Sequence, residues 1–261
     1  MKILYDIIAL IGRQVCKNVG YVTNIIYFIF ESCKRIFTPK FQKTLIIKQM
    51  EFVGNRSLLI IILAGCMVGA VLGLQLGDVF KIFRSESIMG AAVLYTMCKE
   101  FAPIVTGFLV AGRAGSAMAA EIGSMRVNEQ IDAMIIMTVN PYNYIIAPRI
   151  VASMLMMPLL TAIFILVGFF TAFVIGIIFY NIDVGILFEK TKLIVSFKNL
   201  LEGLQKAIIF GGIISIISCY NGFFTKGGAK GVGQATTTSV MLSFVSIIFA
   251  DFIISYIQYR L

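Results

Sequence analysis

Five long apolar runs dominate this chain, and they constrain its fold more than any other feature. They span Ser57–Leu76, Met89 to about Arg113 with its helix continuing toward Gly123, Tyr144–Tyr180, about Leu201–Phe224, and Thr237–Tyr256. A helix needs about 20 predominantly apolar residues to cross a bilayer. Charged residues make up only 13% of the chain, whereas soluble domains carry roughly a quarter. The sequence therefore predicts an all-α integral membrane protein whose five transmembrane helices form one bundle over residues 57–261.

Residues 1–56 differ from the rest because apolar and basic positions alternate. They hold nine Lys or Arg residues against three acidic ones. Their longest uncharged run, Asn18–Phe30, is too short to span a membrane. An amphipathic helix at the membrane interface is therefore favoured, and a first spanning helix is the alternative. The basic residues predict a cytoplasmic N-terminus, although the three lysines of the expected outward loop at 181–200 run against that rule.

Glycine recurs at every fourth position of the first run and beyond it, at Gly65, Gly69, Gly73 and Gly77. Residues four apart share one helix face, and glycine on that face lets a second helix approach closely. Gly112 and Gly115 belong to a similar stretch of small residues in the second run. We expect these six glycines to mark helix packing and not chemistry.

A polar segment, Ala111–Pro141, follows the second apolar run. Its charged residues are Arg113, Glu121, Arg126, Glu129 and Asp132. Asn128 would be a suitable N-cap, and it would place Glu129 and Asp132 in a first turn, where the helix dipole favours negative charge. Three apolar residues share one face of that helix: Ile131, Met134 and Ile135. The pattern predicts a short amphipathic helix from Asn128 to about Met137, on the cytoplasmic side between the second and third spans.

Lys99 and Glu100 place two opposite charges inside the second apolar run. Charges within a transmembrane helix are costly unless they are paired or face water. Consecutive residues point about 100° apart on a helix, so the two side chains need not pair with each other. They either snorkel to the headgroups or line a functional cavity, and the cavity is favoured.

No catalytic constellation is visible in the sequence. The chain has no histidine, which removes the commonest general base. Its five cysteines are scattered and form no CxxC pair. A glycine-rich stretch at Lys226–Gly233 resembles a phosphate-binding loop, but Gln234 stands where that loop requires lysine. The basic residues form no nucleic-acid-binding stripe. We therefore expect no enzyme activity, no cofactor and no nucleic-acid partner, so energy for any transport must come from another protein.

Several ordered motifs then carry a resemblance to a known family. They are Lys99-Glu100-Phe101-Ala102-Pro103, Leu109–Ala117 (LVAGRAGSA), Ala119–Met125 (AAEIGSM), Glu129–Met134 (EQIDAM), Val139-Asn140-Pro141 and Pro148-Arg149. This pattern resembles the MlaE/YrbE permease family over roughly residues 95–160, and the order of spans agrees along the whole chain. One departure is Ala102, where the family usually has glycine, so helix packing is expected to differ slightly there.

The resemblance implies a transmembrane permease subunit of an ABC transporter that moves phospholipids between membranes. It also implies a homodimer, an MCE-domain substrate-binding protein on the outer side, and a cytoplasmic ATPase subunit that binds the ATP. An ABC permease for another hydrophobic small molecule is the alternative. The expected location is a bacterial inner membrane, or a plastid inner envelope if the chain is organellar.

The resemblance also assigns roles to residues of this chain. Lys99 and Glu100 match the family's Lys-Glu pair near the lipid cavity. Phe101 and Leu76 carry no such match, but their apolar side chains would suit acyl chains as walls of that cavity. The ATPase would dock on the helix at 128–137, with Glu121, Arg126, Glu129 and Asp132 as coupling residues.

Overall fold

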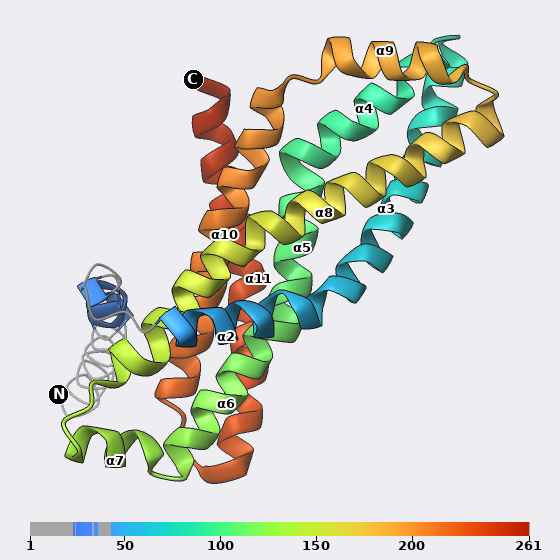
Figure 1. Cartoon of the computed structure of the whole chain (residues 1–261). Coiled ribbons are helices and arrows are strands. Elements are labelled where there is room, and N and C mark those ends of the chain that lie inside the picture. Colours follow the sequence, from blue (N-terminus) through green and yellow to red (C-terminus); the bar gives the residue numbers. More distant parts are fainter. Residues whose placement is uncertain (1–22, 24, 33, 36–42, 261) are drawn as a thin grey trace, which may run out of the picture.

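The computed structural model describes residues 23, 25–32, 34–35 and 43–260. Within these residues the fold is helical, and five segments are long and apolar enough to cross a membrane: Lys43–Ile82, Glu86–Val127, Tyr142–Tyr180, Phe197–Phe223 and Gly228–Arg260. Figure 1 shows them as one elongated bundle. The prediction of an all-α protein with five spans is confirmed. Residues 1–22 of the expected interfacial segment lie outside the described residues, so its interfacial position stays a prediction.

Helical structure begins before the first apolar run. Helix α2 (Lys43–Val53) leads through Gly54 into α3 (Asn55–Ile82), so the expected boundary at residues 56 and 57 falls inside a nearly continuous helical segment. Helix α2 lies across the bundle, whereas α3 rises along it (Figure 1). The charged helix α2 therefore lies at the end of the bundle helix α3 where that apolar helix begins.

Helix α3 packs along α8 (Ala147–Tyr180). The four glycines of α3 are buried on this contact. A Cβ added to Gly69 would overlap the backbone of Gly168, and one added to Gly73 would lie 3.2 Å from the Cα of Ala172. The small residues of α8 thus match those of α3, and the backbones approach closely because neither side carries bulk.

Gly69→Ala is expected to destabilise the bundle by about 1–3 kcal/mol, because the rigid backbone of Gly168 leaves no room for a methyl group. Gly112→Ala is the matched control, since no atom lies within 4 Å of a Cβ at that position. Alanine also favours a helix over glycine by about 1 kcal/mol. Unfolding of both variants in detergent measures the difference. Equal stability of the two would contradict the close packing.

The second span is a chain of short helices. It comprises η1 (Glu86–Ile88), α4 (Met89–Thr96), η2 (Met97–Phe101), α5 (Ala102–Val110), η3 (Ala111–Gly115) and α6 (Ser116–Val127). Segments η2 and η3 are π-helical turns, which occur frequently at functional sites. Segment η2 contains Lys99 and Glu100. Pro103 follows it and has no N–H to bond the carbonyl of Lys99, so the local irregularity has an identifiable cause.

The expected docking helix starts later than predicted. Asn128 closes α6 as its C-cap, and Glu129 precedes α7 (Gln130–Ile136) in a left-handed conformation with φ 57°. The N-cap assignment to Asn128 is therefore wrong, since the turn between the two helices uses Asn128 and Glu129 together. Segment η4 (Tyr142–Ile146) then leads into α8.

Two expected loops are largely helical. Helix α9 (Val184–Ile194) occupies most of the stretch at 181–200. Its N-cap is Asp183, which accepts hydrogen bonds from the backbone N–H groups of Gly185 at 2.8 Å and Ile186 at 3.1 Å. Helix α10 (Phe197–Phe223) follows, and α11 (Gly228–Arg260) begins inside the glycine-rich stretch. Gly227 and Gly228 make that turn possible with φ values of 90° and 66°, which side chains disfavour.

Candidate functional site

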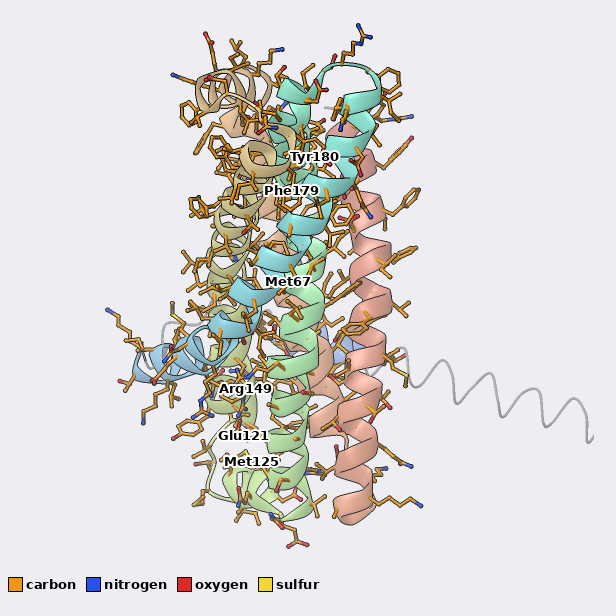
Figure 2. The ribbon with its side chains drawn as sticks, turned by 90° about the vertical axis from the view of Figure 1, so that its right-hand side faces the viewer. Met67, Glu121, Met125, Arg149, Phe179 and Tyr180 are labelled. Atoms are coloured by element: carbon orange, nitrogen blue, oxygen red, sulfur yellow. The ribbon has the colours of Figure 1, made fainter. Side chains whose placement is uncertain are left out.

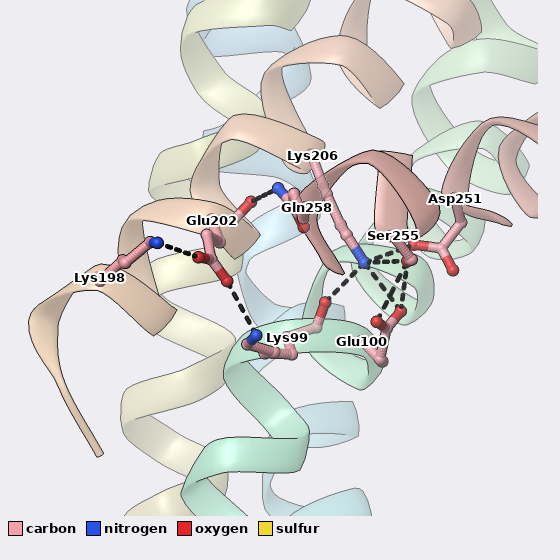
Figure 3. A network of polar contacts seen from close by, with 8 residues as sticks. All are labelled: Lys99, Glu100, Lys198, Glu202, Lys206, Asp251, Ser255 and Gln258. Carbon is pink, nitrogen blue, oxygen red and sulfur yellow. Dashed lines mark hydrogen bonds and ion pairs between the residues drawn. The ribbon is translucent and has the colours of Figure 1, made fainter. Parts of the chain in front are cut away.

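A cluster of charged side chains lies between η2, α10 and α11, well inside the bundle. Lys206 is its centre, with a fully buried side chain. Its ammonium lies 2.9 Å from Glu100 Oε2 and 3.1 Å from Asp251 Oδ1, and it donates to Ser255 Oγ at 2.7 Å. Figure 3 shows these groups converging from three segments that are far apart in the sequence.

Lys206 also stabilises the irregular backbone of η2. Its ammonium donates to the carbonyl oxygen of Lys99 at 2.9 Å. In a regular helix that carbonyl would accept from the residue four positions later, which is Pro103. Because proline has no N–H, the lysine supplies the missing donor. Lys206 therefore connects the backbone of the second span to α10 and α11.

Lys99 belongs to a second group of charges next to the first. Its ammonium lies 3.0 Å from Glu202 Oε2 and 5.3 Å from the ring centre of Tyr95. Lys198 approaches the other oxygen of Glu202 at 3.9 Å. Lys99 and Glu100 thus pair with neighbouring helices and not with each other. Across both groups, three lysines face three carboxylates, and buried charges need such partners.

Two cavities flank η2. One, of about 460 Å³, is lined by both charged residues of η2 together with Tyr95, Thr96 and residues of α11 that include Ser255 and Tyr256. The other, of about 290 Å³, is almost wholly apolar and lies between α3 and the second span; its lining residues are Met67, Val68, Val71, Leu72, Gln75, Phe101 and Val105. We call the first the polar cavity, after its groups Lys99, Glu100 and Ser255, although most of its lining surface is apolar, and we call the second the apolar groove. Charged groups beside apolar walls suit an amphiphilic ligand.

The two expected apolar wall residues behave differently. Phe101 lines the apolar groove and is 42% exposed, so its ring is available to a ligand. Leu76 is not among the groove's lining residues; it packs against the hydrophobic core. Leu72, one helical turn earlier, lines the groove where Leu76 was expected.

The four expected coupling residues differ in their ion-pair partners. Glu121 forms an ion pair with Arg149 Nη2 at 2.8 Å, and the side chain of Arg149 is buried; Figure 2 shows both in the lower part of the bundle. Arg126 and Asp132 pair with each other at 2.5 Å and link α6 to α7. Glu129 is exposed and forms no ion pair with a described residue. Among the described residues it is therefore the one of the four whose charge is not already paired.

Helix α7 also presents apolar side chains to its surroundings. Ile135, Ile136 and Met137 are 52%, 82% and 64% exposed, whereas Ile131 is buried against the bundle. Exposed apolar residues beside a charge are typical of a protein-binding surface. Of these three, the sequence pattern assigned only Ile135 to the apolar face of the amphipathic helix.

Sequence reasoning missed the most buried charge of the site. Lys206, Glu202 and Ser255 were not selected, although Lys206 and Glu202 carry a usable signal. Both are ionisable residues at the edge of an apolar run, and such residues mark functional sites in membrane helices. Their spacing of four also places them on one face of α10.

Comparison with known proteins agrees with this architecture. The family model "Permease MlaE" matches residues 46–257. A Haemophilus influenzae protein named "Intermembrane phospholipid transport system permease protein MlaE" is 34% identical over 259 residues, covering 98% of both chains. A "Probable ABC transporter permease protein" of Rickettsia felis is 35% identical, covering 98% of this chain and 99% of its own.

A plant protein extends the comparison to an organelle. The Arabidopsis thaliana "Protein TRIGALACTOSYLDIACYLGLYCEROL 1, chloroplastic" is 35% identical over 221 residues, which are 85% of this chain and 63% of the plant protein. Relatives of the chain therefore occur in bacteria and in chloroplasts. On the family match and on full-length identities of this size, the chain belongs to the MlaE permease family, as a multi-pass, non-catalytic ABC transporter permease.

Proposed function

We propose that this protein is the membrane subunit of an ABC transporter that moves phospholipids between membranes. The observation that carries the proposal is the pair of cavities beside η2: one holds the charged groups of Lys99 and Glu100 within a mostly apolar lining, and the other is apolar throughout. A phospholipid has a phosphate headgroup and two acyl chains, so it needs both kinds of space. The name of the Haemophilus influenzae relative includes intermembrane phospholipid transport, which supports the same substrate class.

In this proposal Lys99 binds the lipid phosphate. Its side chain is 29% exposed and lines the polar cavity, so a phosphate could reach it while Glu202 holds it in place. Glu100 is 41% exposed and faces the same cavity, where it could accept a hydrogen bond from the headgroup. Phe101 and the apolar groove would hold an acyl chain.

We also propose that the working unit is a homodimer with the lipid path between its copies. Helix α11 supports this, because it carries a row of exposed large apolar residues: Met241, Val245, Ile248, Phe249, Phe252 and Tyr256. Phe252 and Tyr256 also line the polar cavity. A second copy or lipid must cover such a face. An MCE-domain partner on the outer side and a bacterial inner-membrane or plastid-envelope location complete the proposal.

The lipid assignment is tested by the molecules that purify with the protein. After extensive washing, mass spectrometry of the detergent-purified dimer is expected to detect at least about one retained phospholipid per dimer. Phe101→Asp is expected to lower that amount, because a carboxylate in the apolar groove opposes acyl-chain binding. A different hydrophobic small molecule in place of phospholipid would contradict the lipid assignment and favour a permease for another solute.

The ATPase subunit is proposed to dock on α7. Glu129→Arg is expected to weaken co-purification of this ATPase roughly tenfold, because the exposed carboxylate would be replaced by a charge that repels a basic partner. Glu189→Arg on α9 is the matched control, since this exposed glutamate lies at the opposite end of the bundle. Unchanged ATPase binding by the Glu129→Arg variant would remove the docking role of this residue.

A further inference from the structure

A third cavity, of about 430 Å³ and polar in character, lies next to α2. Its lining residues are Lys48, Gln49, Glu51 and Phe52 of α2, Arg56 of α3 and Glu121 of α6. Arg56 and Met67, the first α3 residue of the apolar groove, are separated by roughly 16 Å at about 1.5 Å per helical residue. The cavity is therefore separate from the proposed lipid path.

Positive charge gathers at this cavity. Lys48 and Arg56 line it, and neither forms a salt bridge with a described residue. The guanidinium of Arg56 lies 5.8 Å from the ring centre of Phe52, and that of Arg113 lies 5.0 Å from the same ring. Arg113 also donates to the carbonyl oxygen of Phe52 at 2.5 Å. Cations gathered around one ring repel each other, and a bound anion would relieve that repulsion.

The acidic residues nearby do not cancel this charge. The carboxylate of Glu121 is already held by Arg149 at 2.8 Å, so it does not neutralise Lys48 or Arg56. Of the two carboxylates that line the cavity, only Glu51 forms no ion pair with a described residue. It is therefore one negative charge facing the two positive charges of Lys48 and Arg56. The cavity therefore favours a ligand with a negative group.

Gln49 adds a second requirement on the ligand. Its side-chain oxygen is buried and accepts no hydrogen bond from a described residue. A buried acceptor without a donor is costly, so the ligand should also supply a hydroxyl or ammonium donor. A phosphodiester with such a donor close by has both properties, and phosphatidylglycerol and phosphatidylethanolamine headgroups have this structure.

The position of the cavity indicates where such a ligand comes from. The charged helix α2 crosses the bundle where the apolar helix α3 begins (Figure 1), and Lys and Arg at the end of an apolar span lie near the lipid headgroups. We propose that this cavity binds the phosphodiester headgroup of a resident phospholipid in the adjacent leaflet, distinct from the transported lipid. The headgroup would connect α2 to α6, which leads directly to the docking helix α7.

The absence of tryptophan from the sequence allows a site-specific test. Phe52→Trp places a single fluorophore in the cavity and keeps an aromatic ring beside the two arginines. Ile47→Trp places one on the exposed side of the same helix, where Ile47 is 65% exposed. Both proteins are reconstituted in phosphatidylcholine nanodiscs with increasing phosphatidylglycerol that carries a nitroxide near the headgroup end of an acyl chain.

The measured quantity is the fraction of labelled lipid that quenches half of the tryptophan fluorescence. This fraction is expected to be several-fold lower for the reporter at position 52 than for the reporter at position 47. Adding Lys48→Gln and Arg56→Gln together should raise the fraction needed for half-quenching at least about fivefold, because charge-assisted hydrogen bonds to the phosphate are lost. Lys43→Gln, at the start of the same helix and outside the cavity lining, should leave it unchanged.

Two results would overturn the proposal. Equal quenching of both reporters, unaffected by the double substitution, would show that only bulk lipid is present. Relief of quenching by millimolar inorganic phosphate would assign the cavity to a free phosphate and not to a lipid. Neither result depends on transport, so the test is independent of the proposed function.

Discussion

Replacing Lys206 with methionine is expected to destabilise the protein by about 3–5 kcal/mol and to abolish transport. The substitution removes the cation between Glu100 and Asp251 and leaves two carboxylates without it. Breaking a buried ion pair from one side is costly because the remaining charge is uncompensated. It also leaves the carbonyl of Lys99 without its donor. Unfolding in detergent measures the stability, and lipid flux in proteoliposomes with the ATPase measures the transport.

A triple variant separates stability from function in this experiment. Lys206→Met combined with Glu100→Gln and Asp251→Asn removes all three charges at once, and neutralising a whole buried cluster is often close to neutral for stability. We expect the triple variant to fold and still not to transport lipid. Normal flux in a well-folded triple variant would show that the cluster serves folding alone.

Reversing the charge of Lys99 is expected to reduce lipid flux by more than about tenfold. Lys99→Glu would face Glu202, its present partner at 3.0 Å, and would present a carboxylate to the lipid phosphate in the polar cavity. Both contacts then become repulsive. The flux assay with reconstituted ATPase measures the loss, and Lys192→Glu on α9 serves as the exposed control.

The charge-swapped pair decides which contact matters. Lys99→Glu together with Glu202→Lys restores an ion pair between the same two helices. Recovery of stability without recovery of flux is the expected result, because the lysine would then stand on α10 and not on η2. Full recovery of flux would contradict phosphate binding by Lys99 and leave a structural ion pair.

The sequence predicted those features that depend only on residues close together in the chain. The five spans follow from apolar length, because a segment of that length and composition has no stable place in water. The spacing of Gly65, Gly69, Gly73 and Gly77 puts them on one helix face, since helical periodicity needs no partner, and all four lie buried against α8. Helix ends were less certain: Asn128 had the chemistry of an N-cap, but the turn formed one residue later around Glu129.

The candidate site shows where such reasoning stops. Lys99 and Glu100 were conspicuous because they interrupt an apolar run. Their partners, Glu202 and Lys206, lie more than one hundred residues away in the chain. A single sequence, read by itself, contains no signal that relates such distant positions. Leu76 was expected as an apolar wall of the lipid path, and Leu72 of the same helix lines the apolar groove. Both leucines contact the hydrophobic core, and how the second span packs against α3 determines which of them faces the groove.

Composition and periodicity were thus enough to establish an integral membrane protein, the number of its membrane helices and the presence of charge in the second span. These properties depend on how each segment interacts with lipid and water, and each segment carries that information in its own residues. The pairing of charges across η2, α10 and α11, the two cavities beside η2 and the exposed position of Glu129 required the folded bundle. Each arises from contacts between distant segments, whose geometry is set by the packing of all the helices together.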